Sequence, residues 1–133
     1  MIFSFNPAQG LIRVRVEVTG PTGSAVVYLG LDTGATATVI RTVPLVQAGY
    51  DPVALGHPLQ LTTASGVAQA FRFPVLSLIA LGQARNNFRV IAHNLPPSTS
   101  VDGVLGLDFF RGQVLTLDFV KGEITLTTGG PTP

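Results

Sequence analysis

The chain of 133 residues contains no cysteine and no tryptophan, and only 11% of its residues are charged. The absence of cysteine excludes disulfide frameworks, cysteine-ligated zinc, iron–sulfur clusters and thiol nucleophiles. Eight Lys and Arg against seven Asp and Glu give a formal net charge of 8 − 7 = +1, which is too neutral for electrostatic binding of nucleic acid. Because 46% of the residues are hydrophobic, the chain is also too apolar for a disordered tail.

Long hydrophobic runs are missing as well. No apolar segment reaches the length of about 20 residues that a membrane span requires. The N-terminal segment Met1–Asn6 lacks the basic and then apolar pattern of a signal peptide. The sequence therefore leaves the compartment unknown: cytoplasmic as given, or periplasmic if a signal or an anchor has been removed.

Glycine and proline are abundant, with 15 and 10 residues spread at short intervals along the chain. This punctuation separates many short strands and predicts an all-β fold in one domain, residues 1–133. The clearest strand is Leu11–Val18, in which every second residue is apolar. After a turn at Gly20–Gly23, the segment Ser24–Leu31 is almost continuously apolar, which predicts a strand buried on both faces.

The remaining elements are short. Further strands are expected at Thr38–Arg41, Pro58–Ala64, Val67–Phe73, Val75–Leu81, Asn87–His93, Gln113–Phe119 and Glu123–Thr127. Two short helices are expected at Val43–Ala48 and Leu107–Arg111, because each is followed by a glycine that can end a helix. The pair Asn86-Asn87 is expected to form a turn before a strand.

Six of the seven acidic residues have a purely structural explanation. Asp102 precedes a glycine, as in a tight turn, and Asp108 lies in the first turn of the second expected helix, where a carboxylate favours the helix dipole. The other four are Glu17 on the polar face of a strand, Asp51 before a proline in a turn, and Asp118 and Glu123 beside the last hairpin.

Asp32 has no such explanation. It ends an apolar strand and is followed by the small residues Thr33, Gly34 and Ala35. A carboxylate at the edge of the core requires compensation. Gly34 can provide it by letting the backbone turn sharply and present amide N–H groups, while the Thr33 hydroxyl is short enough to hydrogen-bond neighbouring main chain.

Two motifs and a hairpin carry a resemblance to a known family. The segment Leu31-Asp32-Thr33-Gly34-Ala35 resembles the active-site signature of the pepsin-like and retropepsin-like aspartic proteases. Val104-Leu105-Gly106 resembles the hydrophobic-hydrophobic-Gly segment that packs behind the catalytic loop in that family. Between them, Leu61–Gln69 resembles the flap that closes over substrate. The resemblance runs from about Leu11 to Leu126 and is closest to the single-domain, bacterial-type retropepsin-like proteins.

The resemblance implies a retropepsin-like closed or orthogonal β-barrel with a flap hairpin and one or two short helices, forming one lobe of a C2 homodimer. It also implies an aspartic endopeptidase that needs no cofactor and no metal. Aspartic proteolysis requires two carboxylates that share one proton and one water, and this chain has a single Asp-Thr-Gly. The second carboxylate is therefore expected from Asp32 of a second copy across a two-fold axis.

The same resemblance indicates how copies and substrate would bind. In the family, threonine hydroxyls, here those of Thr33, reach across the axis to the partner's backbone. The apolar and otherwise edge-exposed segments available to join two copies are Met1–Phe5 and Glu123–Thr127. A peptide or protein substrate would bind extended, by strand addition. The expected site residues are Asp32, Thr33 and Gly34 for catalysis and Ala35, Ser65, Gly66, Val67 and Val104 for substrate binding.

Other functions are less well supported by the residues. The expected flap has one glycine at its tip and no tyrosine, so a non-catalytic retropepsin-like module for peptide binding or dimerisation stays an alternative. His57 and His93 lack the spacing of a metal site, and Ser65 lacks the G-x-S-x-G context of a serine hydrolase. No nucleic-acid partner and no metal are expected.

Overall fold

The computed structural model describes residues 1–64, 66–96 and 99–128, and the described part is mainly β-sheet. Its strands are β1 (Ile2–Ser4), β2 (Arg13–Gly20), β3 (Gly23–Leu31), β4 (Val39–Ile40), β5 (His57–Thr63), β6 (Gly66–Ala80), β7 (Gln83–Ala92), β8 (Gly103–Leu105), β9 (Gln113–Asp118) and β10 (Glu123–Thr128). Its helices are α1 (Thr42–Gln47), α2 (Pro52–Leu55) and α3 (Leu107–Phe110). Within these described ranges, no helix is long and apolar enough to cross a membrane.

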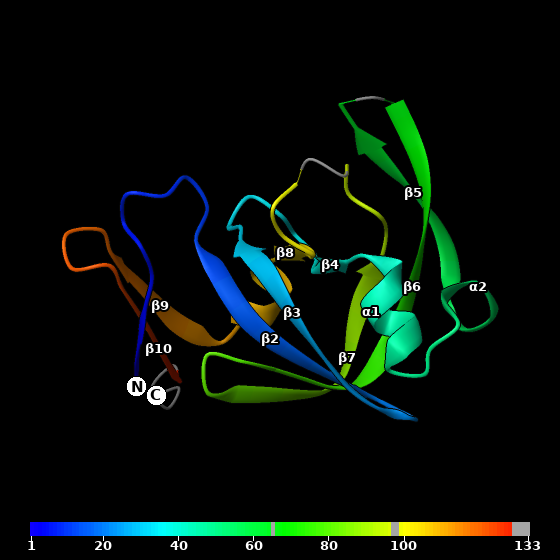
Figure 1. The fold of residues 1–133 in the computed structure, drawn as a ribbon, viewed down its shortest axis with the longest axis horizontal. Coiled ribbons are helices and arrows are strands. Elements are labelled where there is room, and N and C mark those ends of the chain that lie inside the picture. Colours follow the sequence, from blue (N-terminus) through cyan, green and yellow to red (C-terminus); the bar gives the residue numbers. More distant parts are fainter. Residues whose placement is uncertain (65, 97–98, 129–133) are drawn as a thin grey trace.

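Six strands close into a barrel (Figure 1) in the order β2-β3-β8-β4-β7-β6, and β6 pairs back onto β2. Among the described strands, β5 pairs only with β6, and the two form a hairpin that extends away from the barrel. At the other side of the barrel, β1, β10 and β9 form a separate antiparallel sheet. The all-β barrel expected from the sequence is confirmed.

Strand β2 has the alternating burial that its sequence predicts. Val14, Val16 and Val18 point into the core, whereas Arg13 and Arg15 are exposed. A barrel has a single interior, so each of its strands buries one face against the same core. The largest fully buried side chains of that core include Phe73 and Phe109.

Strand β3 corrects the expectation of burial on both faces. Val27 and Leu29 are fully buried, but the alternate residues Val26 and Tyr28 are 47% and 41% exposed. These two side chains lie on the outer face of the barrel, where the guanidinium of Arg13 stacks 5.0 Å from the ring centroid of Tyr28. A continuous apolar run therefore marks a barrel strand here, with one face in the core and one outside it.

Strand β6 is one strand of 15 residues, although Pro74 suggested two. Proline lacks an N–H, so a strand tolerates it only where that N–H would have no ladder partner. Leu76, two residues further on the same side, donates its N–H to the Tyr50 hydroxyl at 2.7 Å and not to β7. The backbone nitrogen of Pro74 faces the same side as that of Leu76. On that side, Pro74 lies in the gap between the part of β6 that pairs with β5 and the part that pairs with β2, so no ladder partner is lost.

The turn between β6 and β7 does not lie at Asn86-Asn87, where the sequence predicts a turn. It is formed by Leu81 and Gly82, whose φ angles of 51° and 73° suit a two-residue hairpin turn. Asn86 and Asn87 lie inside β7 instead, although Asn87 has a turn-like φ of 50°. The sequence gives no signal for a turn at Leu81, because large apolar residues rarely adopt positive φ. Here the Leu81 side chain is buried.

The helices agree in part with expectation. Helices α1 and α3 lie where two short helices were expected, and Gly49 and Gly112 follow them with positive φ. Helix α2 was missed, since Asp51 before Pro52 was interpreted as a turn. The Asp51 carboxylate instead caps this helix by accepting the N–H of Ala54 at 3.2 Å.

In the sheet formed by β1, β10 and β9, only one of the two segments expected to join two copies lies at an edge. Strand β10 pairs with β1 on one side and with β9 on the other, so Glu123–Thr127 is the centre of the sheet and not an edge. Strand β1 remains at the edge, and its Ile2 side chain is 62% exposed.

The connection between β9 and β10 generates a prediction about acid stability. Oδ1 of Asp118 accepts the N–H groups of Lys121 and Val120, both at 2.9 Å. These hydrogen bonds, that of Lys121 first, hold the pKa of Asp118 below its ordinary value of 3.8. A carboxyl with a lower pKa in the folded chain stabilises the fold above its unfolded pKa, and this contribution is lost as pH falls through the folded pKa.

We therefore expect Asp118→Asn to lower the melting temperature at about pH 6, and the difference from the wild type to shrink as pH falls to about 2. Thermal denaturation followed by circular dichroism at a series of pH values measures this. A difference that stays the same across the series would contradict the role assigned to the Asp118 carboxylate.

Candidate active site

Asp32 lies directly after β3, at the start of the loop that leads to β4. Its N–H donates to the carbonyl of Leu105 at 3.0 Å, and its carbonyl accepts the N–H of Ala35 at 3.2 Å. Its Oδ1 accepts the N–H of Gly34 at 2.9 Å. The loop is thus closed by its own main chain, attached to β8, and turned so that one backbone N–H points at the carboxylate.

The side chain of Asp32 is exposed, and not at the edge of the core as the sequence suggested. Gly34 therefore orients the carboxylate and does not compensate for burial. A Cβ at Gly34 would lie 3.2 Å from Oδ1 of Asp32, so any side chain there would crowd the carboxylate. Thr33 is exposed as well, and within the described residues its hydroxyl makes no hydrogen bond.

The Val104-Leu105-Gly106 segment packs against this loop. Strand β8 pairs in parallel with β3, where Leu31 lies opposite Leu105, and antiparallel with β4, where Val39 lies opposite Val104. A Cβ at Gly106 would lie 2.7 Å from the backbone of Ala37. Only glycine permits this approach, which brings together two motifs that are far apart in the sequence.

A buried threonine ties the loop to α3. Thr38 has no exposed surface; its hydroxyl donates to Oδ1 of Asp108 at 2.7 Å and accepts the N–H of Gly106 at 3.1 Å. The other oxygen of Asp108 accepts the N–H of Thr38 at 3.0 Å. Asp108 therefore anchors the Asp32 loop, which the helix-dipole interpretation of this residue does not predict.

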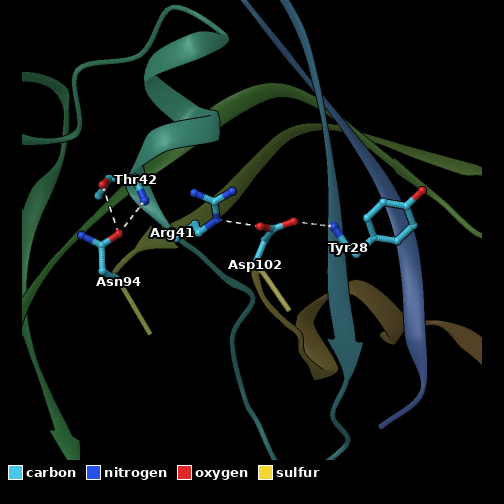
Figure 2. A network of polar contacts seen from close by, with 5 residues as sticks. All are labelled: Tyr28, Arg41, Thr42, Asn94 and Asp102. Carbon is cyan, nitrogen blue, oxygen red and sulfur yellow. Dashed lines mark hydrogen bonds and ion pairs between the residues drawn. The ribbon is translucent and has the colours of Figure 1, made fainter. Parts of the chain in front are cut away.

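Asp102 is an anchor too, and not a turn residue. Figure 2 shows its carboxylate between two segments: Oδ2 accepts the N–H of Tyr28 at 2.8 Å, and Oδ1 accepts Nε–H of Arg41 at 2.6 Å. Nearby, Oδ1 of Asn94 accepts both the N–H and the hydroxyl of Thr42, at 3.0 and 3.1 Å. These contacts hold β8 and the loop after β7 in place beside the Asp32 loop.

A largely apolar pocket of about 610 Å³ lies next to this scaffold. Val39 and Val104 line it from the barrel. The β5–β6 hairpin and the loop after β7 supply its other walls: Leu61, Thr62, Ala64 and Ala68 from the hairpin, and His93, Asn94, Leu95 and Pro96 from the loop.

The expected substrate-binding residues are only partly brought together. Val104 lines the pocket, and Ala35 is half-buried in the Asp32 loop. Val67 lines a different hollow on the β5–β6 hairpin, with Pro58 and Gln69 among its neighbours. Gly66 begins β6 with φ of 120°, and Ser65 lies outside the described residues. Among the residues that are described, no group of three or more His, Asp or Glu side chains could hold a metal ion.

The closed barrel and the anchored Asp-Thr-Gly loop define a class, the retropepsin-like proteins. A solved structure titled as a retropepsin-like aspartic protease from Rickettsia conorii superposes with a TM-score of 0.69. The match has 18% sequence identity and covers 97% of this chain and 89% of the other, so it confirms the retropepsin-like fold. A family model described as Aspartyl protease matches residues 14–109. The chain belongs to this aspartyl protease family, and the comparison with curated proteins gives no match.

The buried network behind the loop yields a second prediction. Thr38→Val keeps the shape of the side chain but leaves the N–H of Gly106 and one oxygen of Asp108 without their partner. A buried polar group left unsatisfied costs about 1–3 kcal/mol, and more when it is charged, so we expect a loss of about 3 kcal/mol in the free energy of unfolding. Urea denaturation measures it.

Thr38→Ser is the matched control, because it keeps the hydroxyl and removes only a methyl group. We expect a loss of about 1 kcal/mol for this variant. Equal losses for Thr38→Val and Thr38→Ser would show that the hydroxyl contributes little.

Proposed function

We propose that this protein is an aspartic endopeptidase that acts as a homodimer, with Asp32 of each copy forming the catalytic dyad. The observation that carries the proposal is the geometry of the Asp32 loop. The Asp32 carboxylate is exposed and is oriented by the N–H of Gly34, and the Asp32 backbone N–H donates to the carbonyl of Leu105 in β8. The chain's membership of the aspartyl protease family and its retropepsin-like fold support protease function.

A single carboxylate does not suffice for this chemistry, since one group must accept a proton while another donates one. Exposed Asp32 and Thr33 side chains suit a two-fold interface, because a symmetric contact places each loop beside its own copy. In the dimer the Thr33 hydroxyl would find its hydrogen-bond partner in the backbone of the opposite loop.

The proposed reaction follows from two carboxyls that share one proton. The ionised carboxylate takes a proton from a water molecule, whose oxygen attacks the peptide carbonyl carbon, while the protonated carboxyl gives its proton to the carbonyl oxygen. The tetrahedral intermediate then breaks its C–N bond. The leaving nitrogen takes a proton from the carboxyl that the water had protonated, while a hydroxyl of the intermediate returns its proton to the other carboxylate. The dyad again holds one proton, one water is consumed, and an acid and an amine are formed.

The substrate in this proposal is an extended peptide between the β5–β6 hairpin, which acts as the flap, and the floor made by β4 and β8. The pocket of about 610 Å³ would take an apolar side chain against Val39 and Val104. Burial of an apolar side chain in such a pocket contributes about 1.5–3 kcal/mol to binding. Strand-like hydrogen bonds to the main chain would supply affinity that does not depend on sequence.

The decisive variant is Asp32→Asn, which keeps the size of the side chain and removes the acid. We expect cleavage of a peptide library at about pH 5 to fall by about 10³-fold or more, because acid–base catalysis is lost. Asp51→Asn is the matched control, since Asn caps a helix as well as Asp does. Cleavage is followed by mass spectrometry and the fold by circular dichroism; undiminished cleavage by Asp32→Asn would refute the proposal.

The same variant tests the shared dyad. When about a fourfold excess of Asp32→Asn is equilibrated with the wild type under dimeric conditions, random pairing leaves about one fifth of the wild-type activity. A rate that does not respond to the excess would show that each chain works alone. Binding of library peptides without any turnover by the wild type would identify the non-catalytic module instead.

A further inference from the structure

A second hollow adjoins the apolar pocket. It has a volume of about 350 Å³ and is lined by Arg41, Asp102, Val101 and Thr99, together with Leu95 and Pro96. Leu95 and Pro96 also line the apolar pocket. The two hollows are therefore neighbours that share one wall, and they differ in chemistry, because the second contains a guanidinium group.

Arg41 is held in one orientation inside this hollow. Its Nε–H donates to Oδ1 of Asp102 at 2.6 Å, and its backbone N–H donates to the carbonyl of the same residue at 2.9 Å. Figure 2 shows the two terminal nitrogens turned away from Asp102. The Arg41 side chain is 43% exposed, and in the described part of the chain these terminal nitrogens have no hydrogen-bond or ion-pair partner.

Both oxygens of the Asp102 carboxylate accept hydrogen bonds within the protein. Its second oxygen accepts the N–H of Tyr28 at 2.8 Å, so Asp102 orients Arg41 from one edge and cannot reach the other. A guanidinium has five N–H donors in a rigid fork, and its outer edge suits two parallel hydrogen bonds to a carboxylate. Because Arg41 is pre-oriented, little further side-chain entropy is lost when a ligand binds there.

An extended peptide places the side chains of residues i and i+2 on the same side, about 6.5 Å apart. Two hollows that share a wall are suited to two such side chains. We infer that Arg41 forms a specificity subsite for an acidic side chain of the substrate, two residues away from the apolar side chain that fills the neighbouring pocket. This inference rests on the proposed function, since it assigns the substrate class of the same groove.

Paired peptides test the inference. Each carries a large apolar residue at the cleavage position and either Glu or its uncharged isostere Gln two residues before it, or two residues after it. At about pH 5.5 free Glu is ionised, and for one of the two placements we expect kcat/KM to be about fivefold higher with Glu than with Gln, as a half-exposed ion pair allows. Added salt should reduce this ratio, because the charge on Arg41 is screened.

The variant Arg41→Met separates recognition from a merely structural role. Loss of the subsite brings the Glu/Gln ratio to about one, whereas a structural defect lowers the rates for both peptides and leaves the ratio unchanged. Arg89→Met is the matched control, because Arg89 is an exposed arginine of β7 that lines neither hollow. It should keep the ratio of the wild type. A ratio that survives in Arg41→Met would overturn the inference.

A binding measurement distinguishes failure of the inference from failure of the proposed function. Fluorescence anisotropy of the labelled Glu and Gln peptides with Asp32→Asn needs no catalysis. Preferential binding of the Glu peptide without any cleavage by the wild type would refute the endopeptidase and still support the subsite. Cleavage without Glu/Gln discrimination in either placement would refute the subsite alone.

Discussion

The parallel pairing of β3 with β8 is the contact on which the candidate site depends. Leu29, Gly30 and Leu31 lie opposite Gly103, Val104 and Leu105, and the next residue, Asp32, continues the ladder through its N–H. This short ladder holds the carboxylate loop and the pocket floor in one register. On its other side β8 passes very close to β4, where a Cβ at Gly103 would collide with the backbone of Val39.

The three acids around the candidate site are of two kinds. Asp102 and Asp108 accept backbone N–H groups from Tyr28 and Thr38, 74 and 70 residues away in the sequence, and so join distant segments around the site. Hydrogen bonds to a charged group contribute about 1.5–3 kcal/mol each, which suits anchors. In the described part of the chain, the Asp32 carboxylate accepts a hydrogen bond only from Gly34 of its own loop and is exposed, which suits the role proposed for it.

Local sequence signals failed where a tertiary contact overrode them. The run of apolar residues in β3 indicated burial on both faces, yet the barrel leaves Val26 and Tyr28 outside. Pro74 indicated a strand break, yet the gap between the β5 and β2 pairings removes the need for its N–H. Asp102-Gly103 indicated a turn, yet the carboxylate anchors two other segments. In each case the deciding neighbour is far away in the sequence.

The amino-acid sequence alone was sufficient for the all-β class, most strand positions and the Asp-Thr-Gly loop, because alternation, turn residues and short motifs are local properties of the chain. Tertiary structure alone decided the closure of the barrel, the anchoring of Thr38 by Asp108, and the two adjacent hollows, one of them lined by Arg41. These features arise where strands and loops from distant parts of the chain meet. Such pairings depend on register and close approach, which no local pattern of residues specifies.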